Sequence, residues 1–395
     1  MKFSRQIFFF SLILHIFSAQ YILAESPAFF SLDVPKFSTH SDEMDYHNFE
    51  EDERYEQVRK FVQSNNIGAL KPSFNGSVVV AHHGKLIFAE SYGVADRAMN
   101  KENSLYTPTQ IASITKTFTG MAILWLQEKG FLDVTDPVQK HLWEFPYNNI
   151  TIEQLLSHSS GLADYLKFAP KHFTLGNPMY NQDVLTQIAQ HKYRLTFTPG
   201  SRFQYSNTNY AMLGLIIEKI SGMSYKEFMQ KYVFEPVGMQ STFVYDPLDE
   251  HKYIFHAKSY YANFSHFPNT FQDGVYADKG IFTTPSDLLK WDRVLNTEEF
   301  ISKSSVDNAF TPRYSWNVSK NYGLGWRIKC YPNQQKYVYH TGWWHGYQGI
   351  LARFINDDFT IIILSNRFIN GISDNAELLY SGAADILEMT KLASK

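Results

Sequence analysis

The stretch Ile111-Ala112-Ser113-Ile114-Thr115-Lys116 decides how the rest of this chain is interpreted. It places Ser113 and Lys116 three residues apart, at the predicted start of a helix. Side chains at this spacing leave the same face of a helix. A serine hydroxyl becomes a nucleophile when a nearby base accepts its proton, and a lysine amine can be that base. The spacing also fits a solvent-exposed pair at a helix end, so the remaining sequence has to separate the two interpretations.

Size and composition indicate a folded protein. The chain has 395 residues, of which 44% are hydrophobic and 16% aromatic, enough to bury a large core. The net charge is −3 and the sequence contains no basic run, so nothing predicts a nucleic-acid partner. Adjacent His82 and His83 lack the local spacing of metal ligands, and we interpret them as turn residues.

Residues 1–24 have the order of a secretory signal peptide. Lys2 and Arg5 precede an apolar run over 7–17, and small residues lead to a predicted cleavage after Ala24. The alternative is an uncleaved membrane anchor, but the run is short for a span and polar residues interrupt it. We therefore predict an exported protein, periplasmic or secreted, with no stable membrane span after cleavage.

Composition divides the remaining chain into a lead-in and one folded domain. Residues 25–52 are polar and acidic, and we expect one folded domain over 53–392. The region from about 131 to 290 has the pattern of helices and loops. The expected elements are helices over about 54–62, 113–126, 210–220 and 373–391, and strands over 76–81, 85–89, 322–328, 337–340, 350–354 and 360–364.

Strands at both ends of the domain and helices in the middle predict the fold class. We expect an α/β protein of the α+β type, in which N- and C-terminal segments build one antiparallel sheet flanked by helices. The mostly helical region would be inserted into this framework. Cys330 is the only cysteine, so no intramolecular disulfide can form, and its strand-like surroundings predict a packed core thiol.

Two further sites accompany the serine and lysine. Tyr205 and Asn207 lie in a loop directly before a predicted helix, where side chains can face a cleft. The Y-x-N pattern occurs five times and means little alone, whereas the triplet His340-Thr341-Gly342 occurs once, at a strand end. His158 lies in a serine-rich loop and could be a catalytic base, but a histidine that bonds its own loop is the favoured interpretation.

In this order, the three motifs resemble the serine β-lactamase and penicillin-binding protein superfamily, in its class C-like branch. The matching context extends over roughly residues 55–390. It includes Leu155-Leu156-Ser157-His158-Ser159-Ser160-Gly161-Leu162, Pro199-Gly200-Ser201, Thr283-Thr284-Pro285-Ser286-Asp287-Leu288 and Tyr322-Gly323-Leu324-Gly325-Trp326. The resemblance implies a β-lactamase/transpeptidase-like fold and makes the domain over 53–392 a β-lactamase-like serine hydrolase domain.

The resemblance also implies a role for each motif residue. Ser113 would attack an acyl carbon, and Lys116 would share the serine proton with Tyr205. Asn207 would hold both Lys116 and the substrate amide. The backbone N–H groups of Ser113 and Trp343 would bind the oxyanion. The resemblance requires no metal and no organic cofactor.

The third motif departs from the family pattern in two ways. His340, Thr341 and Gly342 would form a substrate-binding edge, but His340 stands where many relatives have lysine. A histidine with an ordinary pKa is largely neutral at pH 7, which weakens the expectation of classical β-lactamase activity. The second departure is Trp343-Trp344, where small residues are usual, and these indoles would narrow the cleft or stack on an apolar acyl group.

We therefore expect an exported serine acyl hydrolase with D,D-carboxypeptidase-like, esterase-like or β-lactamase-like activity. Its substrate would be a small-molecule or peptide amide or ester, including peptidoglycan-derived peptides. The alternative is a non-catalytic penicillin-binding-like sensor or scaffold. An inactive relative is expected to lose Ser113, Lys116 or Tyr205, and this chain retains all three.

Overall fold

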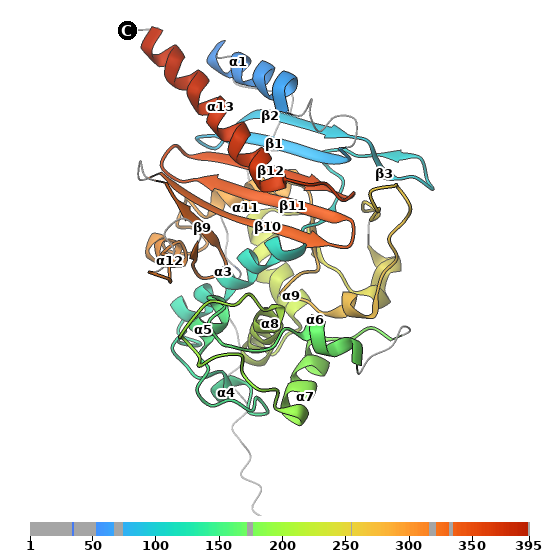
Figure 1. Cartoon of the computed structure of the whole chain (residues 1–395), viewed down its shortest axis with the longest axis vertical. Coiled ribbons are helices and arrows are strands. Elements are labelled where there is room, and N and C mark those ends of the chain that lie inside the picture. The colour runs from blue at the N-terminus through green and yellow to red at the C-terminus, as the bar shows by residue number, and fades with distance from the viewer. Residues whose placement is uncertain are drawn as a thin grey trace, which may run out of the picture. The chain divides into compact units, whose positions relative to one another are not determined.

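A seven-stranded antiparallel sheet forms the centre of the structure (Figure 1). The structure is a computed structural model and describes residues 34, 53–66, 74–171, 177–253, 255–315, 321–331 and 335–393. The predicted signal peptide over 1–24 and nearly all of the predicted lead-in over 25–52 lie outside these residues. The strands follow the order β2 (Lys85–Tyr92), β1 (Gly76–His82), β12 (Phe359–Ser365), β11 (Tyr347–Phe354), β10 (Lys336–Trp344), β9 (Arg327–Cys330) and β8 (Asn321–Tyr322).

The sheet joins the two ends of the domain, as predicted. Strand β1 pairs with β12 in a register that places Val78 opposite Ile363 and Val80 opposite Ile361. These four side chains are buried, and full burial of such a side chain contributes about 1.5–3 kcal/mol. Because the first and last long strands are neighbours, the N-terminal hairpin is held by the C-terminal one.

Helices cover both faces of the sheet (Figure 1). One face carries α1 (Glu53–Phe61), which continues as a short π-helix over Val62–Asn66, and α13 (Ile372–Ala393). The two helices come close together at Gly382, where a Cβ atom would lie 1.9 Å from the Phe61 ring. The other face carries α3 (Thr115–Glu128) and α11 (Pro285–Val294).

The region predicted as helices and loops forms a helical part beyond α3 (Figure 1). It contains α4 (Val138–His141), α5 (Ile152–Leu156), α6 (Tyr165–Phe168), α7 (Asn181–His191), α8 (Asn207–Ser221), α9 (Tyr225–Met229) and α10 (Glu235–Val237), and α12 (Lys303–Ala309) follows α11. Two small sheets were not predicted. They are β3 (Val94–Asp96) with β4 (Lys101–Glu102), and β5 (Thr109–Gln110) with β7 (Ile281–Thr283) and β6 (Phe243–Val244).

One predicted element is wrong. The sequence indicated a single strand over 322–328, whereas the structure forms a tight hairpin in which Tyr322 of β8 pairs with Arg327 of β9. Gly325 makes this turn possible because its φ is +92°, in a region that L side chains rarely adopt. Gly323 allows a close approach, since a Cβ there would lie 2.0 Å from the Ala309 carbonyl oxygen.

The other predicted elements are present, with changes at their ends. Strand β10 continues to Trp344, so His340-Thr341-Gly342 lies within the strand and not at its end. Helix α8 begins at Asn207, three residues before the predicted start. Cys330 is half-buried at the end of β9, so it is not the packed core thiol that was expected. In the part of the chain that the structure describes, no helix combines the length and the apolar composition needed to cross a membrane.

Candidate active site

The segment that carries Ser113 lies between the sheet and α3. A short 3₁₀ turn over Ala112–Ile114 leads directly into α3, so the predicted helix start is confirmed. Ala112, the residue before the serine, has a φ of +46°. This left-handed conformation is unfavourable for a residue with a Cβ, and such backbone outliers gather at functional sites. It places the half-buried Ser113 side chain on the wall of a cavity.

Lys116 lies beneath this serine and is fully buried. Its Nζ donates to Ser113 Oγ at 2.9 Å, to Asn207 Oδ1 at 2.9 Å and to the backbone carbonyl of Asp278 at 2.6 Å. A lysine ammonium has three N–H donors, and each of them has an acceptor here. The structure therefore excludes the interpretation of Ser113 and Lys116 as a solvent-exposed pair.

Tyr205 approaches the serine from the helical part of the molecule. Its hydroxyl donates to Ser113 Oγ at 2.9 Å. The loop that presents it is held by His158, whose carbonyl accepts the Gln204 N–H at 2.9 Å and whose Nδ1 accepts the Ser206 N–H at 3.2 Å. His158 is buried and does not line the cavity, which agrees with the loop-bonding interpretation. Burial, and then the charge of Lys116, hold its pKa well below the ordinary value.

Asn207 is fixed by a carboxylate that the sequence did not reveal. Its side-chain N–H donates to Asp164 Oδ2 at 3.0 Å, and its backbone N–H donates to the same oxygen at 3.2 Å. Asp164 is also the N-cap of α6 and accepts the Leu166 N–H at 3.0 Å. Burial raises the pKa of Asp164. These bonds orient the Asn207 amide so that its oxygen faces Lys116.

Strand β10 forms the opposite wall of the cavity. It pairs with β9 only over residues 336–339. Beyond Tyr339, this edge of β10 has no partner strand and faces the nucleophile segment. Gly342 lies there, and a Cβ at this position would be 2.1 Å from the Ile111 carbonyl oxygen. Thr341 and Trp343 line the cavity, and the Trp343 side chain is 65% exposed.

His340, which was expected on the substrate-binding edge, faces the interior instead. It is fully buried, accepts a hydrogen bond from the Tyr322 hydroxyl at 3.0 Å and donates to the Thr341 carbonyl at 2.7 Å. Burial, followed by the charges of Arg327 and Lys116, holds its pKa well below the ordinary value. The imidazole is therefore neutral, and the structure does not bring it to the cavity wall.

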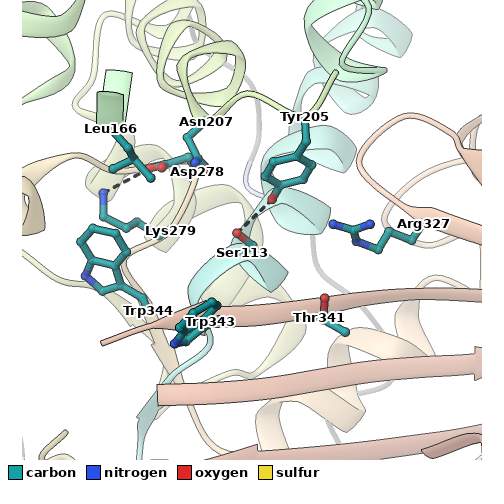
Figure 2. Close-up of a pocket in the computed structure, with 10 residues that line it drawn as sticks. All are labelled: Ser113, Leu166, Tyr205, Asn207, Asp278, Lys279, Arg327, Thr341, Trp343 and Trp344. Carbon is teal, nitrogen blue, oxygen red and sulfur yellow. Dashed lines mark hydrogen bonds and ion pairs between the residues drawn. The ribbon is translucent and has the colours of Figure 1, made fainter. Parts of the chain in front are cut away.

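The cavity has a volume of about 260 Å³, and Figure 2 shows the side chains around it. Its lining residues are Ser113, Leu166, Tyr205, Asn207, Asp278, Lys279, Arg327, Thr341, Trp343 and Trp344. Sequence reasoning missed Arg327, Lys279 and Asp278. A charged residue inside the strand-like pattern near the third motif was a signal for Arg327, but no local pattern marks the other two. Among the described residues, no group of three or more potential ligands could hold a metal ion.

The nucleophile segment, the buried lysine and the tyrosine define a serine hydrolase. The profile of the family described as Beta-lactamase matches residues 70–381, and the chain belongs to this family of β-lactamase and penicillin-binding protein-like enzymes. The resemblance and the fold class inferred from the sequence are thereby confirmed.

Three known proteins illustrate the relationship. Penicillin-binding protein 4* of Bacillus subtilis strain 168 is 35% identical over 319 residues, which cover 75% of this chain and 69% of that protein. Teichoic acid D-alanine hydrolase of Staphylococcus aureus is 25% identical over 327 residues, or 80% of this chain and 74% of that protein. The octameric penicillin-binding protein homologue from Pyrococcus abyssi superimposes with a TM-score of 0.71 at 26% identity, over 83% of this chain and 76% of that one.

Proposed function

We propose that this protein hydrolyses amide or ester substrates through an acyl-enzyme on Ser113. The observation that carries the proposal is the double contact at the serine. Ser113 Oγ lies 2.9 Å from Lys116 Nζ and 2.9 Å from the Tyr205 hydroxyl. Two groups that can exchange protons with the serine are thus within hydrogen-bond distance of its hydroxyl, as activation of a serine requires.

Acylation follows from these contacts. The step requires one member of the Lys116–Tyr205 pair, the amine or the phenolate, to be without its proton at the start. Ser113 Oγ then forms a bond to the acyl carbon while the serine proton passes to that group. The carbonyl oxygen becomes an oxyanion, and the backbone N–H groups of Ser113 and Trp343 stabilise it. One such donor contributes about 3 kcal/mol to transition-state binding. The bond to the leaving group then breaks, and Tyr205 returns the proton to the departing nitrogen or oxygen.

Deacylation uses the same groups with water in place of the leaving group. The Lys116–Tyr205 pair accepts a proton from water, which attacks the Ser113 ester and releases the acid. The proton returns to Ser113 Oγ. Asn207 keeps Lys116 in position throughout, because its amide is itself held by Asp164 at 3.0 Å.

Arg327 is proposed to bind the substrate carboxylate, the role of the lysine that many relatives have at the position of His340. Its guanidinium lies on the cavity wall, 5.3 Å from the centre of the Tyr205 ring. A carboxylate on the leaving group would meet this cation next to the proton donor. The name of one relative, a teichoic acid D-alanine hydrolase, supports substrates that contain a D-alanyl group.

Export is part of the proposal. The order of charged, apolar and small residues over 1–24 supports removal of a signal peptide after Ala24. The mature chain would then consist of the lead-in over 25–52 and the hydrolase domain over 53–392, in the periplasm or outside the cell. N-terminal sequencing of the protein recovered from outside the cytoplasm checks this expectation.

Covalent trapping tests the hydrolase mechanism. Incubation with a fluorophosphonate or a labelled penicillin, followed by peptide mass spectrometry, is expected to place an adduct on Ser113. The Ser113→Ala variant is the matched control and should remain unlabelled. Absence of an adduct with both reagents, on folded protein, would contradict the enzyme proposal and favour the non-catalytic sensor or scaffold.

A further inference from the structure

The sequence left two roles open for the indoles of Trp343 and Trp344, and none of the roles above uses either side chain. Both residues line the cavity. The Trp343 side chain is 65% exposed, and its Nε1 donates to the His345 carbonyl at 3.1 Å. Trp344, in contrast, is half-buried. The structure thus separates an indole that is mostly in solvent from one that is packed into the protein.

A buried carboxylate holds the edge of the Trp344 indole. The indole N–H donates to Asp273 Oδ1 at 2.6 Å, and the Asp273 side chain is only 2% exposed. The same oxygen accepts from His345 Nε2 at 3.0 Å, and the other carboxylate oxygen accepts from the Thr270 hydroxyl at 3.1 Å. Rotation of the indole away from Asp273 would break these contacts and leave a polar N–H without its partner, which costs free energy.

A buried ammonium lies against the face of the same indole. Lys279 Nζ is 4.8 Å from the centre of the Trp344 ring, within the range of a cation–π contact. The Lys279 side chain is 5% exposed, and its Nζ donates to the Tyr165 hydroxyl at 2.7 Å and to the Val275 carbonyl at 3.0 Å. Because these bonds fix the ammonium, the indole is held at its face as well as at its edge.

The turn that follows Trp344 is also closely packed. Gly346 donates its N–H to Ser259 Oγ at 2.7 Å, and a Cβ on Gly346 would lie 2.1 Å from the Tyr260 carbonyl oxygen. Neither the backbone nor the indole can move aside without the loss of such contacts. Trp344 is therefore a rigid part of the cavity wall.

The position of this indole relates it to the acyl part of a substrate. Figure 2 shows Trp344 and Leu166 on one side of Ser113 and Arg327 on the opposite side. Tyr205, the proposed proton donor to the leaving group, has its ring centre 5.3 Å from the Arg327 guanidinium, so the leaving group occupies that side. The acyl group, which stays on the serine, extends toward Trp344.

The room on the acyl side is small. The whole cavity has a volume of about 260 Å³. For comparison, an apolar cavity of about 150 Å³ holds one benzene molecule. The scissile group and the start of the leaving group take part of the volume, so a short acyl chain fits into the rest. A longer chain would have to displace the indole.

We propose that Trp344 determines specificity by limiting the length of the acyl group. The enzyme then prefers amides and esters of short acyl groups, such as acetyl and propionyl, to those of long ones, such as hexanoyl. The indole excludes a long chain rather than stacking on it, which decides between the two roles that the sequence left open. This inference rests on the proposed function and narrows its acyl substrates.

A pair of 4-nitrophenyl esters, the propionate and the hexanoate, tests this limit. Their carbonyl groups have nearly the same intrinsic reactivity, so the ratio of the two kcat/KM values reports how each chain fits. Wild-type kcat/KM should be higher for the propionate by about ten-fold or more. Trp344→Leu shortens the wall but keeps it apolar, and it should bring this ratio toward one by raising the rate for the hexanoate.

Two further variants make the test specific to this indole. Trp344→Phe keeps a ring but lacks the N–H that bonds Asp273, and it should give an intermediate ratio even if Trp344→Leu does not fold. Trp343→Leu makes the same replacement at the exposed indole. Whatever its effect on the absolute rates, this matched control should leave the ratio unchanged.

Propionate esters of 4-nitrophenol and of the larger 4-methylumbelliferone vary the leaving group instead. Replacement of Trp344 should leave the ratio between these esters unchanged, since they share one acyl group. A wild-type rate that rises from propionate to hexanoate, an acyl ratio that neither Trp344 variant changes, or a change in the leaving-group ratio alone would overturn the limit. Turnover of the propionate that Ser113→Ala abolishes establishes the hydrolase separately, and its absence overturns both proposals.

Discussion

Lys116 has no exposed surface, and each of its N–H donors has an acceptor within the protein. Burial of a lysine costs much free energy unless its polar atoms are paired in this way. The acceptors come from three parts of the chain, namely the nucleophile segment, the start of α8 and the loop at Asp278. The arrangement holds the amine at the serine more tightly than the spacing of three residues alone could.

Replacement of this lysine should abolish most of the activity. Lys116→Met keeps most of the side-chain volume but removes the proton acceptor, so kcat/KM should fall by about 10³-fold, within the usual range for a general base. Ester hydrolysis measures the loss, and circular dichroism checks that the variant is folded. Lys140→Met, at an exposed lysine of α4, is the control and should keep the wild-type rate. A near wild-type rate in Lys116→Met would remove Lys116 as the base.

Individual residues also show where sequence reasoning stops. Ser113 and Lys116 could be predicted because their spacing is local, and Tyr205 because it precedes a helix. Asp164 and Lys279 could not, because their importance depends on contacts with Asn207 and Trp344 that only the folded chain brings together. His340 was assigned to the cavity because the motif is contiguous, but its side chain is fully buried and bonded to the Tyr322 hydroxyl.

At the scale of elements, the apolar periodicity predicted long helices and strands well and short ones poorly. Helix α13 and strands β11 and β12 have many buried residues in register, so their patterns are clear. The β8–β9 hairpin has a strand of two residues and depends on glycines whose close approaches lie far away in sequence. Such elements are determined by tertiary contact rather than by local pattern.

The edge of β10 lies against the nucleophile segment, and Gly342 is the residue that allows this contact. A Cβ on Gly342 would lie 2.1 Å from the backbone oxygen of Ile111, which cannot yield without movement of the strand or of the nucleophile segment. Gly342→Ala should therefore displace the Trp343 N–H from the proposed oxyanion site. We expect a loss of about 10²-fold in kcat with little change in the circular dichroism spectrum.

Gly349→Ala is the matched control for this experiment. Gly349 pairs directly with Gly342 in the β10–β11 register. Its added Cβ would meet the ends of the Leu364 and Ile114 side chains at 3.0 and 3.1 Å and the Ile363 carbonyl oxygen at 3.3 Å. The two shortest contacts are thus with side chains, which can move more easily than backbone, and the backbone contact is much longer than the one at Gly342. Equal losses in both variants would show that general disturbance of the sheet, rather than the position of β10, limits the rate.

At the scale of the whole molecule, the site lies where the sheet and the helical part meet. Ser113 lies in the turn that leads into α3 and Lys116 in its first turn, Tyr205 lies in the loop before α8 and Asn207 begins that helix, and Thr341 lies in β10. Two buried histidines occupy the same boundary. His158 comes from the helical part and His340 from the sheet, and both contact Tyr322, whose ring centre is 4.8 Å from that of His158.

These histidines predict how stability depends on pH. Both have a folded pKa well below the ordinary value of 6.5, chiefly because of burial. Below about pH 6.5 the unfolded chain therefore binds protons that the folded chain does not, so the free energy of unfolding must fall as pH falls. The slope approaches about 1.4 kcal/mol per pH unit for each histidine. Burial raises the pKa of Asp164, so this carboxyl contributes with the opposite sign.

Urea unfolding between pH 8 and pH 5 measures this slope. Wild-type stability should be constant above about pH 7 and should decline steadily below about pH 6.5. His340→Gln removes one of the two titrating groups, so the decline should be about half as steep, even if this variant is less stable at pH 8. His251→Gln, at an exposed histidine, should retain the full slope. If the free energy of unfolding of His340→Gln declines as steeply with falling pH as that of the wild type, groups other than His340 bind the protons, and this prediction is wrong.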